Sequence, residues 1–258
     1  MRSARRSIPT RRVVHWGWAL CVLVLFVGFA ALGTWQVQRR AWKLDLIERV
    51  NQRVSAPAAN APAPGDWPRV NAANDEYRHV RLTGRFLAGR DVRVQAVTNI
   101  GSGFWLLSPL QQTDGSVVLV NRGFVPSKEA PVRVPGAEVT ITGLLRLTEP
   151  GGGFLRANDP AAERWFSRDV AAIARARGLD GLGGVAPYFV DADAAPAGTQ
   201  EDPAAPVGGL TVIAFHNSHL VYALTWYALA LMVAGAGIGL ALQNAKHHDP
   251  ARRPHAAP

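Results

Sequence analysis

The sequence has little cysteine, since Cys21 is the only one among 258 residues. A single cysteine excludes an intramolecular disulfide, a CxxC redox pair and a thiolate metal cluster. Acidic residues are also few: 19 Asp and Glu stand against 28 Lys and Arg, and the net charge is +9. The excess positive charge lies beside two long apolar stretches near the chain ends, so membrane lipid is the expected anionic partner and nucleic acid is not.

Motifs of common enzymes are absent as well. The chain has no GxSxG, no HExxH, no P-loop and no GxGxxG after a strand pattern. Its short glycine groups at 101–103 and 151–153 are typical of turns, and the histidines of the central region do not fall at metal-ligand spacings. We therefore expect a protein that is not an enzyme.

Two windows of the chain lack Asp, Glu, Lys and Arg, one between Arg12 and Arg39 and one between Asp202 and Lys246. Each contains an apolar run of about 20 residues or more, which is the length of a helix that crosses a bilayer. We expect transmembrane helices over 14–36 and 218–242. The alternative for the first is a cleaved signal peptide, but its length and the lack of an A-x-A-like site favour a retained span.

The distribution of basic residues predicts the orientation. Three Lys and Arg residues follow the second span, and none lies within the 20 residues before it. The positive-inside rule then places the C-terminus in the cytoplasm, and two spans place the N-terminus there too. We expect an inner-membrane protein whose central domain lies in the periplasm.

Three glycines near the end of the second span have two interpretations. They either allow a neighbouring helix to approach closely or are ordinary lipid-facing positions. These residues are Gly235, Gly237 and Gly239.

The rest of the chain divides by composition. We expect a basic tail over 1–13 and a helical extension of the first span over 37–54. An Ala/Pro-rich linker over 55–68 should lead into a β-rich domain over 69–217, and a second tail should cover 243–258. Short apolar runs bounded by turn residues predict strands at 78–86, 91–99, 103–111, 116–126, 138–147, 187–194 and 210–215. A helix is expected from Asp159, as its N-cap, to Gly178. This pattern predicts an α+β fold, mostly antiparallel β, sandwich- or barrel-like, with one helix.

A polar and aromatic cluster lies where the second span begins. His219, Tyr222 and Trp226 share a helical face if the helix starts near Asn217. An imidazole beside aromatic rings can ligate a haem iron axially. The alternative is an interfacial aromatic belt, with Asn217 or Ser218 as the helix cap.

A second cluster follows the first span, and spacings of three and four place its members on one helical face. The members are Trp35, Gln36, Arg39, Trp42 and Lys43. Snorkelling cations beside an aromatic anchor are one interpretation. The other is a cationic, aromatic surface for the acidic edge of a partner or for a haem propionate.

The order of these motifs resembles the Surfeit locus protein 1 family, bacterial type. The resemblance extends almost from end to end and rests on GTWQVQRRAWKLDLIERV, WLLSPLQQTDGSVVLVNRGFVP, PYFVDADAAPAGT and HNSHLVYALTWYALAL. It implies an assembly factor for cytochrome c oxidase that assists delivery or insertion of haem a into the large subunit, with haem A synthase as a further candidate partner. It also implies that His219 ligates the haem iron transiently.

Two positions depart from the family pattern. His216 stands where the family usually has Arg, and Phe124 stands where it often has Trp. The first departure weakens the expectation that a cation at that position holds a propionate. Two other functions stay open: a scaffold that stabilises oxidase subunits without binding haem, and a membrane enzyme that acts on haem or lipid, which needs paired acid and base groups in a polar pocket.

Overall fold

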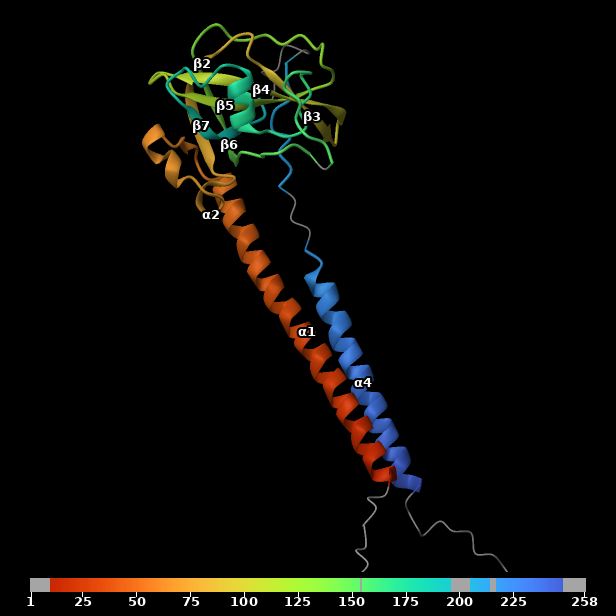
Figure 1. The fold of residues 1–258 in the computed structure, drawn as a ribbon. Coiled ribbons are helices and arrows are strands. Elements are labelled where there is room, and N and C mark those ends of the chain that lie inside the picture. Colours follow the sequence, from red (N-terminus) through yellow and green to blue (C-terminus); the bar gives the residue numbers. More distant parts are fainter. Residues whose placement is uncertain (1–9, 154, 196–204, 214–216, 248–258) are drawn as a thin grey trace, which may run out of the picture. The chain divides into compact units, whose positions relative to one another are not determined.

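The computed structural model describes residues 10–153, 155–195, 205–213 and 217–247 (Figure 1). The chain divides into two compact units. The helical unit combines 1–47 with 215–258, and the β-rich unit comprises 48–214.

The helical unit contains α1 (Thr10–Ser55), whose last residues belong to the β-rich unit, and α4 (His219–His247). Both are long and apolar enough to cross a membrane. Their apolar side chains are largely exposed, as at Leu20 (62%) and Leu231 (71%), which suits a helix surrounded by lipid. The two predicted spans are thus confirmed as candidate transmembrane helices, one before and one after the domain in the chain.

The helices α1 and α4 lie side by side and antiparallel (Figure 1). The rings of Phe29 and Trp226 stack with their centres 5.7 Å apart. A Cβ built on Gly237 would lie only 2.7 Å from a methyl carbon of Val22 on α1. Gly237 therefore permits close approach of the helices, as one interpretation of the glycine group expects.

The other two glycines of that group differ from Gly237. A Cβ on Gly235 or Gly239 would meet nothing within 4 Å. A position on α1 instead completes the close contact: a Cβ on Gly33 would lie 2.8 Å from the Tyr227 ring. Small residues thus bring the two backbones together at both ends of the contact.

Within the described residues, the β-rich unit has seven strands in the order β1-β2-β6-β7-β5-β4-β3. They are β1 (Ala59–Asn60), β2 (His79–Phe86), β3 (Val92–Thr98), β4 (Gly101–Gln112), β5 (Val117–Val125), β6 (Val139–Leu147) and β7 (Val185–Ala192). An additional β2–β4 pairing closes β2, β6, β7, β5 and β4 into a barrel-like ring. The pairs are antiparallel except β1–β2 and β5–β7, which confirms the expected mostly antiparallel fold.

Two apolar clusters lie on opposite faces of β5, because alternate residues of a strand point to opposite sides. Val118 and Val120 join a cluster to which all five strands of the ring contribute. Val117 and Leu119 join a second cluster under α3 (Val170–Ala176). A strand buried on both faces has a nearly continuous apolar sequence, as β5 does.

The expected helix over 159–178 is wrong in its length. Only α3 is helical, and Asp169 is its N-cap. Asp159 caps a turn instead, where it accepts the N–H of Ala162 at 3.1 Å. Trp165 lies between them, 2% exposed and bridged to β3, so burial of this large ring in an extended segment overrides the local helix signals.

The prediction of a last strand over 210–215 is also wrong for the residues that the structure describes. Residues 210–213 form no regular secondary structure, and 214–215 lie outside the described residues. The preceding segment pairs with the barrel instead: Val207 and Phe124 exchange backbone hydrogen bonds at 2.9 and 3.0 Å. The barrel therefore gains its contact three residues before the expected strand begins.

Two short helices occur where no helix is expected. They are η1 (Pro64–Arg69) and α2 (Ala72–Asp75). The Ala/Pro-rich segment that leads into η1 packs on the barrel: the Trp67 indole donates to the Pro62 carbonyl at 3.1 Å, and the buried Tyr188 hydroxyl donates to the same oxygen at 2.8 Å. Its proline-rich backbone thus has fixed partners on the domain.

Candidate functional site

His219 is the first residue of α4, and its side chain is half-buried. Ser218 occupies the N-cap position, and its carbonyl accepts the N–H of Tyr222 at 3.3 Å. The His219 ring lies against α1, where its Nδ1 is 2.7 Å from Oε1 of Gln36. The two clusters that the sequence singles out therefore meet at this contact.

The contact between His219 and Gln36 favours one position of the proton on the imidazole ring. A side-chain amide oxygen only accepts hydrogen bonds, so Nδ1 of His219 donates. In the neutral ring Nε2 then keeps an unshared electron pair. A metal-ligating histidine is oriented in this way by a carbonyl or carboxylate that accepts its other N–H.

The aromatic residues near His219 occupy two different sides of α4. Trp226 lies two turns along the helix and stacks on Phe29 of α1. Tyr222 is 54% exposed, whereas Ala223 is 2% exposed. The three residues predicted to share one face of α4 therefore differ in their surroundings. His219 and Trp226 contact α1, whereas the side chain of Tyr222 is mostly exposed.

Asn217 precedes α4 and contributes an unsatisfied polar group. Its Oδ1 is buried and has no hydrogen-bond partner among the residues that the structure describes. Buried acceptors normally have a partner, so this oxygen is an exception among the described polar groups. His216, the neighbouring departure from the family pattern, lies outside the described residues.

The cluster after the first span separates into two stripes on α1. Trp35, Arg39 and Trp42 are exposed. The Cζ atom of Arg39 lies 4.1 Å from the centre of the Trp42 ring, a cation–π contact. This stripe presents a cation and two aromatic rings away from α4.

The second stripe contains Gln36, Arg40 and Lys43, which repeat at four and three and are half-buried. Arg40 is a residue that the sequence analysis missed. It lies one turn beyond Gln36 and is half-buried like Gln36, whereas Arg39 is exposed. The signal that could have found it is the repeat of 29, 33, 36, 40 and 43, which is the period of a helix that packs on a neighbour.

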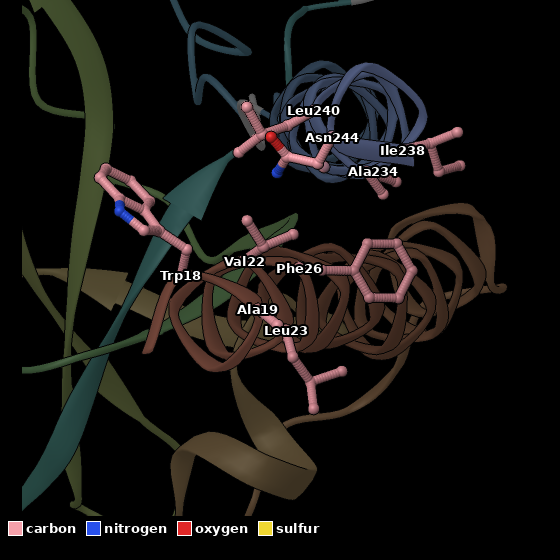
Figure 2. A pocket seen from close by; sticks show the side chains of 11 residues that line it. Trp18, Ala19, Val22, Leu23, Phe26, Ala234, Ile238, Leu240 and Asn244 are labelled. Atoms are coloured by element: carbon pink, nitrogen blue, oxygen red, sulfur yellow. The ribbon is translucent and has the colours of Figure 1, made fainter. Parts of the chain in front are cut away.

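A separate apolar groove lies between α1 and α4, with a volume of about 630 Å³. Figure 2 shows side chains from both helices around it, among them Trp18, Val22, Phe26, Ala234, Ile238 and Asn244. Ala234 lies 15 residues after His219, roughly 22 Å along the helix. The groove contains no predicted site residue and is distant from the His219 contact.

The β-rich unit contains a buried ionic cluster that the sequence analysis also missed. Asp191 is 3% exposed, and its carboxylate accepts hydrogen bonds from Asn121, Arg146, Arg168 and Thr211. Burial raises the pKa of Glu149 beside it, but hydrogen bonds and charge from Arg168 lower this pKa, which is below its usual range. The carboxylates of Asp191 and Glu149 are thus paired with arginine.

No group of three or more His, Cys, Asp or Glu side chains that could hold a metal ion occurs among the described residues. His219 offers one further ring nitrogen, Nε2, besides the Nδ1 that contacts Gln36.

Comparison with known proteins identifies the family. The SURF1 family profile matches residues 23–231, which include Gln36 and His219. Surfeit locus protein 1 of Rattus norvegicus is 35% identical over 229 residues, 80% of this chain and 70% of the relative. The Homo sapiens protein is 35% identical over 235 residues (83% and 73%), and the SURF1-like protein of Drosophila melanogaster is 32% identical over 254 (87% and 79%). The chain therefore belongs to the SURF1 family.

Proposed function

We propose that this protein is an assembly factor for cytochrome c oxidase that receives haem a and passes it to the large subunit. The observation that carries the proposal is the contact at 2.7 Å between Nδ1 of His219 and Oε1 of Gln36. It leaves Nε2 of His219 with an electron pair for the haem iron. Haem a is cargo here and is bound transiently.

The surroundings of His219 fit such a cargo. A porphyrin needs one axial nitrogen, aromatic or apolar surface for its ring, and a cation for its propionates. Tyr222 offers an exposed ring, and Arg40 offers a cation one turn from Gln36. Asn217 adds a buried acceptor that has no partner among the described residues.

The position of His219 in the chain also supports the proposal. It is the first residue of a candidate membrane span, so the site lies at one face of the bilayer. With the charge distribution of the sequence, we propose that both termini are cytoplasmic and that the site and the β-rich domain face the periplasm. The partners are then the oxidase large subunit, haem A synthase as a haem donor, and membrane lipid.

The test is the absorption spectrum of the full chain purified in detergent from cells that make haem A. We expect a haem a spectrum for the wild type and its loss in His219→Ala. His79→Ala is the matched control, because His79 lies in the β-rich domain, where its ring contacts Asp193. The His79→Ala variant should keep the haem. A haem-free wild type, or unchanged haem in His219→Ala, would refute the proposal.

A scaffold that stabilises oxidase subunits without haem is the second candidate. It is favoured by exposed apolar side chains at the turn between β3 and β4, where Val97 is 82% and Ile100 is 52% exposed. A scaffold predicts that His219→Ala still co-purifies with the large subunit. It also predicts that serine at both Val97 and Ile100 weakens this association, whereas the haem-carrier function alone predicts no effect of these changes.

A further inference from the structure

We infer that Gln36 is a positioning residue that selects the tautomer of His219 and thereby presents Nε2 to the iron. The inference rests on the proposed function and adds a residue from the other helix to its site. The partners lie 183 residues apart in sequence.

The first step concerns the proton on His219. In a neutral imidazole either nitrogen carries the hydrogen, and only the form with hydrogen on Nδ1 has an electron pair on Nε2. The amide oxygen of Gln36 lies 2.7 Å from Nδ1 and accepts from it. The hydrogen bond thus stabilises the form that binds metal.

The second step concerns how Gln36 is held. Its helix packs closely on α4 through Gly33, whose position leaves no room for a side chain against Tyr227. Thr34 and Tyr227 share a hydrogen bond at 3.1 Å in the same contact. Gln36 therefore extends from a helix that other contacts already position, as a group that orients a ligand requires.

The third step concerns what the hydrogen bond does to bound iron. An acceptor on the outer N–H of an axial histidine raises the basicity of the ligand, and loss of such an acceptor typically weakens metal binding by about 10- to 100-fold. A carboxylate accepts more strongly than an amide. A histidine whose N–H is bound to a carboxylate should therefore donate more electron density to the iron and stabilise the ferric state.

The experiment uses the full chain in detergent and ferric haem b as the probe, followed by absorption titration and measurement of the midpoint potential. We expect Gln36→Leu to weaken haem binding by about 10- to 100-fold. Gln36→Glu should restore binding and lower the midpoint potential. Thr34→Val is the matched control, because it removes another hydrogen bond between the same two helices without touching His219.

The outcomes separate the two proposals. If Gln36→Leu and Thr34→Val weaken binding equally, and Gln36→Glu leaves the midpoint potential unchanged, Gln36 only joins the helices and the inference fails. If haem b binds as well to His219→Ala as to the wild type, or does not bind the wild type, the proposed function itself fails.

Discussion

Replacing Asp191 with alanine removes the anion shared by two partly buried arginines. The side chains of Arg146 and Arg168 are 15% and 13% exposed, and each lies within 3.2 Å of the Asp191 carboxylate. Removing one partner of a buried ion pair destabilises a protein by about 3–5 kcal/mol. Glu76 and Glu149 still pair with the two arginines, so we expect the lower end, about 3 kcal/mol.

Such a loss is large against the stability of a domain, about 5–15 kcal/mol. For a unit of this size it should lower the Tm by about 6–12 °C. The assay is thermal unfolding of the full chain in detergent, followed by near-UV circular dichroism. Glu149→Gln is the control, because its 39% exposed carboxylate should contribute less than about 1 kcal/mol. An equal Tm for the two variants would refute the reasoning.

Three further predictions follow from single contacts. Gly33→Val should separate α1 from α4 and weaken haem binding, whereas Gly28→Val, with open space around it, should leave titrations unchanged. Burial alone would lower the pKa of His79. Hydrogen bonds to Asp193 and to a backbone carbonyl, together with the negative charge of Asp193, outweigh it and raise the pKa above 6.5. Its stabilisation is therefore complete below about pH 6.5 and is lost as the pH rises through the folded pKa, so His79→Gln should remove this decline in Tm across a pH series. Arg40→Gln should weaken binding of haem but not of its dimethyl ester, which has no carboxylates; equal weakening of both would exclude a propionate contact.

Prediction from the sequence succeeds for elements whose signal is local. The strand period of two marks β2 and β3, both of which the structure contains. It fails where burial across the fold overrides local signals. The caps and spacing of 159–178 are those of a helix, but Trp165 is buried against β3 in an extended segment. The apolar run 210–213 likewise has no strand partner, because Val207 already occupies the edge beside Phe124.

The site divides in the same way. The sequence identifies His219 and Gln36 separately, but a period on one helix carries no information on which residue of another helix it faces. Arg40 is missed for this reason, since its proposed role depends on its place one turn beyond the contact.

The sequence by itself determines that two long apolar helices flank a β-rich domain, because length, hydrophobicity and period two are properties of neighbouring residues. Only the tertiary structure decides that β2 pairs with β4 to close the ring, that two arginines share Asp191, and that Oε1 of Gln36 accepts a hydrogen bond from Nδ1 of His219. These contacts join residues far apart in the chain, so they depend on how closely whole elements pack. Between α1 and α4, small residues such as Gly33 permit this close packing.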